Sequence, residues 1–330
     1  MNEILLEVQD LCKYFPVRGG FLGKEKGEIK AVDGVSFSIS KGETLSLVGE
    51  SGCGKSTLGR TAIRLYEPTA GHIYYRGQDI TSLSSRESKA LRRNMQIIFQ
   101  DPYSSLNPRM NIYAAISEAM IEHGITRKGA ETNERVDELL TMCGLAPEHK
   151  YRYPHQFSGG QRQRIGIARA LALNPEFIVC DEPVSALDVS IQSQIINLMM
   201  ELQEKIGLSY LFISHDLGVV RHLSTRVGVM YLGSIVELAP RSDLYEDPLH
   251  PYTQALLSAV PIPDPSVKKE PKIIQGEIPG NVNLPSGCKF HTRCPYAQKI
   301  CEQEVPPLRE VKPHHYAACH FAGEISYHNS

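Results

Sequence analysis

The residue types best suited to chemistry stand together in one glycine-rich run near position 50. Its members are Gly49, Glu50, Ser51, Gly52, Cys53, Gly54, Lys55, Ser56 and Thr57. An apolar segment, residues 44–48, precedes the run, and apolar residues at helical spacing follow it. Between a strand and a helix, such a run turns backbone N–H groups inward and forms a cradle for phosphate oxygens. We expect Lys55 to reach the β- and γ-phosphates of a nucleotide and the Ser56 hydroxyl to bind Mg²⁺.

A second candidate is a pair of acids that ends an apolar segment. Asp181 and Glu182 directly follow residues 177–180, which read as a buried strand. Standing alone, such a pair could be an ordinary surface turn. Together with a phosphate-binding loop, it predicts that Asp181 holds Mg²⁺ through water and that Glu182 polarises an attacking water. General-base help of this kind contributes about 10²–10⁴-fold in rate.

A third candidate opens a helix further along the chain. Ser158, Gly159, Gly160 and Gln161 follow Phe157, and a serine with two glycines at a helix N-terminus can bind an anion. The chain then has two phosphate sites for one nucleotide. This excess predicts that the second site serves a nucleotide held by a neighbouring chain.

In these segments the chain resembles the ABC family of ATPases, whose signature reads Leu-Ser-Gly-Gly-Gln with Leu at the position of Phe157. The resemblance implies ATP and Mg²⁺ as cofactors and ATP hydrolysis as the reaction. It implies that Gln100 links Mg²⁺ to a helical subdomain and that His215 contacts the γ-phosphate and orients the water. Asp188, in the run 185–188, matches a loop that crosses a dimer interface.

Dimers of such cassettes enclose each ATP between the phosphate loop of one chain and the signature of the other. The resemblance implies that Lys55, Glu182 and His215 act on the chain's own ATP. It implies that Ser158 and Gly160 act on the partner's ATP.

The adenine ring usually stacks on an aromatic residue near the N-terminus of these cassettes. Tyr14 and Phe15 are both available in this chain. Their spacing favours Phe15.

Strand and helix patterns alternate along most of the chain, which predicts an α/β fold with a mostly parallel sheet covered on both faces. Between about 100 and 160 the strand patterns disappear, and residues 111–124 and 131–144 read as two helices of a helical subdomain. Ser190 is a candidate cap for a later helix. The resemblance adds a RecA-like core of the P-loop NTPase type with an antiparallel β subdomain.

Four domain segments follow from this pattern. Residues 1–100 form the first part of the nucleotide-binding core, with a mobile basic insertion at 17–30. Residues 101–160 form the helical subdomain with the signature at its end, and residues 161–240 form the second part of the core. Prolines become frequent from there on, which predicts a small loop-rich C-terminal extension at 241–330.

The composition of the 330-residue chain is that of a globular protein, with 42% hydrophobic and 22% charged residues and a net charge of −2. This charge gives no reason to expect nucleic acid as the main partner. No segment approaches the roughly 18 to 20 apolar residues of a membrane span, and the N-terminus lacks the features of a signal peptide. We therefore expect a peripheral protein that docks onto another protein at the cytoplasmic face of the cell membrane.

Several segments resemble one branch of the family, the ATP-binding subunits of oligopeptide and dipeptide importers. They are residues 14–17 with the insertion at 17–30, residues 31–37, residues 100–108 and residues 250–253. The resemblance implies that this chain is the F-type member of a heterodimer with a second, D-type ATPase subunit. Two transmembrane permeases and an extracytoplasmic peptide-binding protein complete the expected machine, with residues 101–120 forming a groove for the permeases. Nickel and glutathione importers share this cassette type.

A soluble ABC ATPase acting on nucleic acid or ribosomes is the alternative from another class. DNA-repair proteins of this family carry a long coiled coil between the phosphate loop and the signature. In this chain only about fifty residues separate Gln100 from Phe157, without sustained heptads. Translation factors place two cassettes in one chain, and this chain has one. A transporter subunit is therefore favoured.

Four cysteines cluster in the C-terminal extension: Cys288, Cys294, Cys301 and Cys319. A proline-rich segment buries little apolar area, so a metal centre would supply cross-links. The wide spacing favours an iron–sulfur cluster over Zn²⁺, whose usual sites contain Cys-x2-Cys pairs, and unliganded thiols are a third possibility. The resemblance points to a four-iron, four-sulfur (4Fe–4S) cluster, which some peptide-importer cassettes carry here. Four nearby histidines are alternative ligands that we otherwise expect at the surface: His291, His314, His315 and His320.

Overall fold

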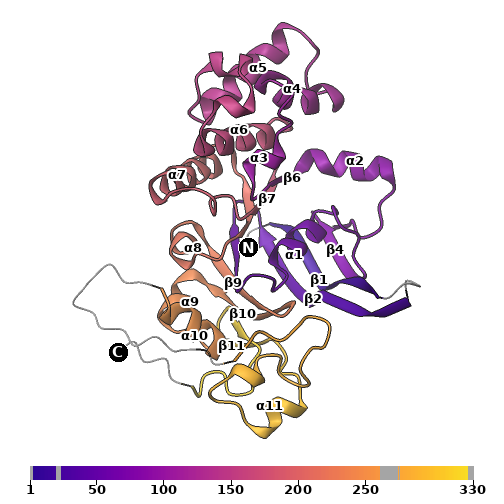
Figure 1. Cartoon of the computed structure of the whole chain (residues 1–330), viewed down its shortest axis with the longest axis vertical. Helices are drawn as coiled ribbons and strands as arrows, with labels where there is room; N and C mark the ends of the chain where they lie inside the picture. Colours follow the sequence, from indigo (N-terminus) through magenta and orange to yellow (C-terminus); the bar gives the residue numbers. More distant parts are fainter. Residues whose placement is uncertain (1–2, 20–23, 261–273, 275, 326–330) are drawn as a thin grey trace, which may run out of the picture. The chain divides into compact units, whose positions relative to one another are not determined.

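A computed structural model of the chain describes residues 3–19, 24–260, 274 and 276–325. The chain forms two compact units. The first unit comprises Met1–Glu3, Ser40–Glu43 and Ser82–Ile213, and the second comprises Ile4–Ile39, Thr44–Thr81 and Ser214–Ser330. Figure 1 labels the elements of both units.

The second unit contains a four-stranded sheet in the order β2-β1-β4-β5. Its strands are β1 (Ile4–Gly19), β2 (Lys24–Ser40), β4 (Ala70–Tyr75) and β5 (Gln78–Asp79). β4 runs antiparallel to both β1 and β5, with Leu6 opposite Tyr75. Leu6 and Val8 on β1 and Ile73 on β4 have buried side chains. The antiparallel sheet agrees with the β subdomain that the resemblance implied.

The part of the predicted insertion at 17–30 that the structure describes is strand and not loop. β1 continues to Gly19, and β2 begins at Lys24; residues 20–23 lie outside the described residues. Glycines weaken a strand and obscure its alternation, so the sequence pattern reads as a loop. Pairing with the neighbouring strand satisfies the backbone N–H and C=O groups and makes this stretch a strand.

The second unit also holds five strands of a larger sheet, in the order β11-β12-β10-β9-β3. β3 and β9 are parallel, with Leu47 opposite Gly228, whereas β9, β10, β12 and β11 pair antiparallel. The strands are β3 (Thr44–Val48), β9 (Arg226–Tyr231), β10 (Ser234–Pro240), β11 (Arg309–Lys312) and β12 (His315–Ala317). The helices are α1 (Lys55–Ala62), α8 (Leu217–Leu223), α9 (Arg241–Glu246), α10 (Pro251–Ser258) and α11 (Lys299–Gln303), with a 3-10 turn at His291–Arg293.

The first unit is built on three parallel strands in the order β8-β7-β6. They are β6 (Met95–Ile98), β7 (Phe177–Asp181) and β8 (Ser209–Ile213). All residues of β7 and β8 are buried, as a parallel strand covered on both faces requires. The helices are α2 (Ser85–Asn94), α3 (Pro102–Ser105), α4 (Ile112–Glu122), α5 (Ala130–Met142), α6 (Gly159–Leu171) and α7 (Val189–Ile206), with 3-10 turns at Pro147–Tyr151 and Pro154–Gln156.

The helix predicted to start at a Ser190 cap begins earlier. α7 starts at Val189, and the side chain of Asp188 accepts a hydrogen bond from the N–H of Ile191 at 3.0 Å. Asp and Ser are equally good caps, so local preference cannot choose between the two positions. Ser190 instead lies exposed in the first turn.

A short hairpin ties the C-terminal extension, orange to yellow in Figure 1, to the sheet of the second unit. β12 pairs with β10, with Glu237 opposite Ala317, and β11 pairs with β12. Leu249, Ala317 and Ala322 form a small buried apolar cluster beside it. The extension is loop-rich, as expected, and its hairpin adds two strands at the edge of the sheet.

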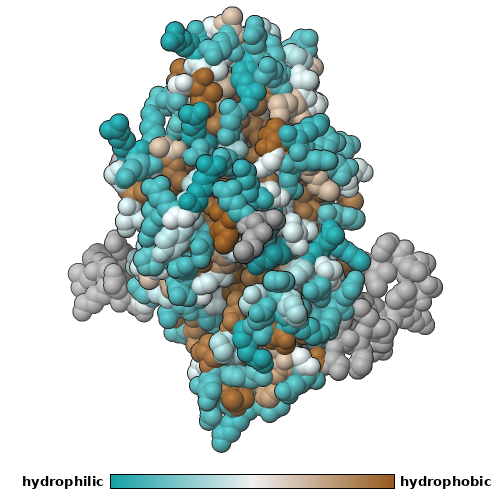
Figure 2. Space-filling model, turned by 180° about the vertical axis from the view of Figure 1, so that it is seen from behind, coloured by the Kyte–Doolittle hydropathy of each residue, from teal (hydrophilic) through white to brown (hydrophobic). Residues whose placement is uncertain are grey.

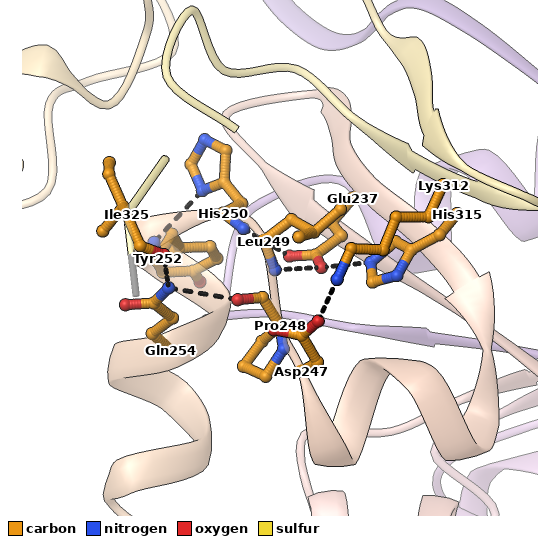
Figure 3. Close-up of polar contacts among 10 residues, drawn as sticks. All are labelled: Glu237, Asp247, Pro248, Leu249, His250, Tyr252, Gln254, Lys312, His315 and Ile325. Carbon is orange, nitrogen blue, oxygen red and sulfur yellow. Dashed lines mark hydrogen bonds and ion pairs between the residues drawn. The ribbon is translucent and has the colours of Figure 1, made fainter. Parts of the chain in front are cut away.

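A buried carboxylate anchors this extension (Figure 3). Glu237, fully buried on β10, accepts hydrogen bonds from the N–H groups of Leu249 (2.7 Å) and His250 (2.9 Å). The Nε2 atom of His315 on β12 lies 2.7 Å from a Glu237 oxygen. One side chain therefore joins three segments: β10, the turn before α10 and β12.

Among the described helices, none combines the length and hydropathy that a membrane span needs. On the face drawn in Figure 2, hydrophobic residues are interspersed among hydrophilic ones. Exposed large apolar side chains include Tyr103, Val189 and Val305.

Candidate functional site

The glycine-rich run forms a loop between β3 and α1 in the second unit. Gly49, Gly52 and Gly54 have φ angles of 148°, 79° and 107°, in the region that L side chains rarely adopt. Lys55 is buried, and its ammonium donates hydrogen bonds to the carbonyl oxygens of Gly49 (2.7 Å) and Glu50 (3.0 Å). The lysine thus folds back over the loop, where phosphate oxygens can take over as acceptors.

Gly52 and Gly54 offer a matched test of this loop. A Cβ atom at Gly54 would lie 2.0 Å from the carbonyl oxygen of Ala31, whereas one at Gly52 would meet nothing within 4 Å. Both substitutions carry the left-handed penalty of about 1–2 kcal/mol, but only Gly54→Ala adds a backbone overlap. In titrations with a fluorescent ATP analogue, we expect Gly54→Ala to abolish measurable binding and Gly52→Ala to weaken it about tenfold or less. Equal affinities in the two variants would contradict the prediction.

The two aromatic candidates for adenine stacking have different surroundings. The hydroxyl of Tyr14 donates to a carboxylate oxygen of Asp33 at 2.5 Å, and burial with this bond raises the pKa of Tyr14. Asp33 also accepts a hydrogen bond from Lys289 at 2.8 Å. Phe15 is partly exposed; it meets the edge of Tyr66, at 5.8 Å between ring centroids, and the ammonium of Lys13 lies 5.0 Å from the centroid of its ring. Tyr14 is therefore already engaged in a hydrogen bond to Asp33, which favours Phe15 as the stacking residue.

His215 lies exposed in the turn before α8. Asp216 fixes this turn, because its carboxylate accepts from the N–H groups of Gly218 (2.7 Å) and Val219 (3.2 Å). The N–H of Asp216 donates to the hydroxyl of Ser214 at 3.0 Å. The turn presents the imidazole at the surface, where it can contact a ligand.

In the first unit, the acidic pair stands where β7 ends. Asp181 is almost fully buried, at 1% exposure, and Glu182 is partly exposed with a φ angle of 48°. Such a backbone costs about 1–3 kcal/mol and persists only where the surroundings hold it. The N–H of Glu182 donates to the carbonyl of Ile213 at 3.0 Å, and the amide of Gln100 donates to the Glu182 carboxylate at 2.9 Å. The structure thus brings together Gln100 and Glu182, which sequence reasoning assigned to one reaction.

The signature segment caps α6. The Ser158 hydroxyl accepts a hydrogen bond from the N–H of Gln161 (3.3 Å), and the Gln161 side chain accepts one from the N–H of Ser158 (3.1 Å). This reciprocal box satisfies two backbone donors and fixes both side chains. Ser158 is exposed at the start of the helix, as an anion site requires.

The signature glycines also serve packing within the first unit. A Cβ atom at Gly160 would lie 2.5 Å from the side chain of Ile191 on α7, and one at Gly159 would lie 3.3 Å from Leu187. Asp188, next to Leu187, is exposed and caps α7. The predicted dimer loop and the signature are therefore neighbours, held by close contact of the start of α6 with α7.

The four clustered cysteines line one pocket in the second unit, together with Phe290 and others. Burial raises the pKa of Cys294 and of Cys319 to about 11. No cysteine in the described residues forms a disulfide. Within the same residues, no group of three or more His, Cys, Asp or Glu side chains is arranged to hold a metal ion. The four cysteines therefore share a pocket, and the expected metal-binding character of the extension is not established.

The histidines considered as alternative ligands have other contacts. His315 is buried against Glu237, so the expectation that it lies at the surface is wrong. Ring nitrogens of His291 and His320 contact backbone carbonyl oxygens at 2.9 and 3.0 Å. His314 is exposed.

Sequence reasoning missed three residues that contact the phosphate loop from the last third of the chain. They are Tyr252, Asn281 and Arg293. No periodicity or motif marks them, because their partners lie more than 200 positions away in sequence. The available signal was the position of Arg293, directly before Cys294 in the cysteine cluster.

Comparison with known proteins identifies both parts of the chain. Residues 32–185 match the family profile described as ABC transporter, and residues 236–301 match the one described as oligopeptide/dipeptide transporter, C-terminal region. The chain is 59% identical over 322 residues to the oligopeptide transport ATP-binding protein AppF of Bacillus subtilis (strain 168), covering 97% of this chain and 98% of that relative. The chain belongs to the ATP-binding proteins of the ABC transporter family, in its oligopeptide-transport branch. A putative peptide import ATP-binding protein of Brucella ovis is 54% identical, covering 96% of this chain and 97% of the relative.

Solved ABC cassettes share the fold. The dimeric cassette MJ0796 in a post-hydrolysis state bound to ADP and phosphate aligns with a TM-score of 0.63 and 29% identity, covering 72% of this chain and 99% of that one. The cassette cbiO1 from Clostridium perfringens aligns with a TM-score of 0.62 and 27% identity, covering 74% and 91%. The predicted α/β cassette fold is confirmed.

Proposed function

We propose that the chain is the ATP-hydrolysing subunit of an ABC importer that takes up oligopeptides or dipeptides through partner permeases. The observation that carries this proposal is the near full-length similarity to an oligopeptide transport ATP-binding protein, which includes the C-terminal region as well as the cassette. ATP and Mg²⁺ are the cofactors of the ABC ATPase family. A soluble ATPase acting on nucleic acid or ribosomes is not favoured, because the matching relatives are named for peptide transport.

The sequence motifs assign the handling of the chain's own ATP to the following residues. Lys55 and the loop amides bind the phosphates, Ser56 and Asp181 hold Mg²⁺ directly or through water, and Glu182 polarises the attacking water. The hydrogen bond from Gln100 supports this assignment, because it orients the Glu182 carboxylate. His215 contacts the γ-phosphate.

The partner's ATP would be completed by the signature, Ser158 to Gln161, with Asp188 crossing the interface. The capping box supports this role, because it fixes the Ser158 hydroxyl at the exposed start of α6. A D-type ATPase subunit is the proposed partner in a heterodimer.

Co-purification tests the whole proposal. An affinity-tagged chain expressed in its native cell is expected to bring down two permeases and a second cassette at the cytoplasmic face of the membrane. Cross-linkers placed within residues 101–120 are expected to reach the permeases, because this stretch follows Gln100 and contains the exposed Tyr103. Recovery of ribosomes or DNA, without permeases, would favour the soluble alternative.

We further propose that Cys288, Cys294, Cys301 and Cys319 hold a 4Fe–4S cluster. The support is that the side chains of all four cysteines line one pocket. A cluster binds each thiolate at a separate iron, whereas Zn²⁺ needs all four around one ion. When bound, the cluster would cross-link segments of the extension.

Anaerobic purification checks the cluster. We expect a brown protein that contains iron and acid-labile sulfide in equal amounts, and a Cys301→Ser variant that loses both and unfolds at a lower temperature. Cys143→Ser, which changes a buried cysteine of the first unit, is the matched control and is expected to keep the iron. Stoichiometric zinc without iron would contradict the cluster.

A further inference from the structure

The phosphate loop is held by an ion pair from the C-terminal extension. The guanidinium of Arg293 donates two hydrogen bonds to the carboxylate of Glu50, from Nη1 to Oε2 at 2.7 Å and from Nη2 to Oε1 at 3.0 Å. The Arg293 side chain is 6% exposed and that of Glu50 is 25% exposed. These bonds raise the pKa of Arg293. Such a fork is among the stronger side-chain contacts, and it fixes the orientation of both groups.

Two further residues of the last third of the chain hold the loop backbone. The hydroxyl of Tyr252 on α10 accepts a hydrogen bond from the N–H of Glu50 at 2.9 Å. The amide of Asn281 donates to the carbonyl of Gly52 at 3.0 Å. These contacts flank Ser51, so the first half of the loop is fixed at two backbone positions and one side chain.

Arg293 is itself held firmly. Its guanidinium lies 3.4 Å from the hydroxyl of Tyr231. Tyr231 packs against Tyr252 and Phe290, with ring centroids 4.8 and 5.3 Å apart, and Phe290 also lines the cysteine pocket. These contacts tie the arginine, and through it the loop, to packed aromatic residues of the second unit.

We propose that Arg293 is a positioning residue for nucleotide binding, through which the C-terminal extension sets the affinity of the phosphate loop for ATP. The inference rests on the proposed ATPase function. Two effects act in the same direction. A loop fixed before binding loses less conformational freedom when ATP arrives, and the pairing neutralises a carboxylate that would otherwise repel the nearby phosphates.

A simple role in holding the extension together predicts a different result. In that case the loss of Arg293 would lower the unfolding temperature and leave the ATP affinity of the folded protein unchanged. The measurement that separates the two roles is therefore the dissociation constant for ATP of the folded, full-length chain.

The experiment compares R293Q, R293K and the double variant R293Q/E50Q by titration with a fluorescent ATP analogue and Mg²⁺. We expect R293Q to bind about 5–10-fold more weakly, the range of a modest coupling between sites. R293K keeps the charge without the fork and should fall between R293Q and the unchanged chain. The double variant should recover part of the loss, since it also removes the unpaired carboxylate.

K312M is the matched control. Lys312 lies in the same extension and pairs with Asp247 at an exposed site. We expect its ATP affinity to equal that of the unchanged chain. An R293Q affinity within twofold of the unchanged chain, or an equal loss in K312M, would overturn the inference. If R293Q does not fold, R293K is measured in its place. An ATP affinity of R293K within twofold of the unchanged chain would then overturn the inference. If the unchanged chain binds no ATP, the proposed function itself fails.

Discussion

Glu182→Gln is expected to lower the rate of ATP hydrolysis by about 10²–10⁴-fold while ATP binding is retained. The substitution keeps the shape of the side chain, and its amide oxygen can still accept the hydrogen bond from Gln100, which spans 2.9 Å in the structure. What it removes is the negative charge that, in the proposed mechanism, draws a proton from the attacking water. The loss should therefore appear in the turnover number, with little change in the dissociation constant for ATP.

A trapped complex is the second signature of this variant. If two cassettes enclose each ATP, a chain that binds but does not hydrolyse should accumulate as an ATP-bound dimer with its partner, which light scattering can detect. Glu201→Gln is the matched control, because Glu201 lies exposed on α7 and pairs with Lys205 in the next helical turn. Normal turnover in Glu182→Gln would refute Glu182 as the group that activates water.

Local patterns predicted those parts of the fold whose cause is local. The apolar run 177–180 reads as a strand because both faces of β7 are buried, so burial leaves a continuous signature in the sequence. The predicted ends of α4 and α5 lie within one or two residues of the observed ends, because the buried face of a helix also leaves a periodic apolar pattern in the sequence. The strand at Lys24 was missed because pairing with β1 makes it a strand, and glycine obscures its alternation.

The candidate site also has parts that local sequence predicts and parts that it does not. The phosphate loop and the acidic pair were predicted because each is a short run whose chemistry lies in its own residues. The contact of Gln100 with Glu182 spans 82 positions, and the contact of Arg293 with Glu50 spans 243. Neither contact leaves a periodic or spacing signal, since only the folded chain brings the partners together. The contacts between the extension and the loop could therefore be found only in the structure.

The second large effect is expected at Glu237, where the extension joins the sheet (Figure 3). Glu237→Leu would leave two buried backbone N–H groups, those of Leu249 and His250, and the ring of His315 without their acceptor. Removing one partner from a buried charged network costs about 3–5 kcal/mol. We expect the free energy of unfolding of the second unit to fall by about this amount in urea titrations.

Hydrogen exchange gives the local form of the same prediction. The amides of Leu249 and His250 should exchange faster in Glu237→Leu, because each donates to the carboxylate that the variant removes. Asp247→Asn is the matched control: its exposed pair with Lys312 lies in the same turn and should contribute about 0–1 kcal/mol. Equal unfolding midpoints for both variants would mean that the hairpin holds the extension without the carboxylate. If only Glu237→Leu loses stability and it also binds ATP more weakly, the contacts of Glu237 in the extension support the loop that Arg293 contacts.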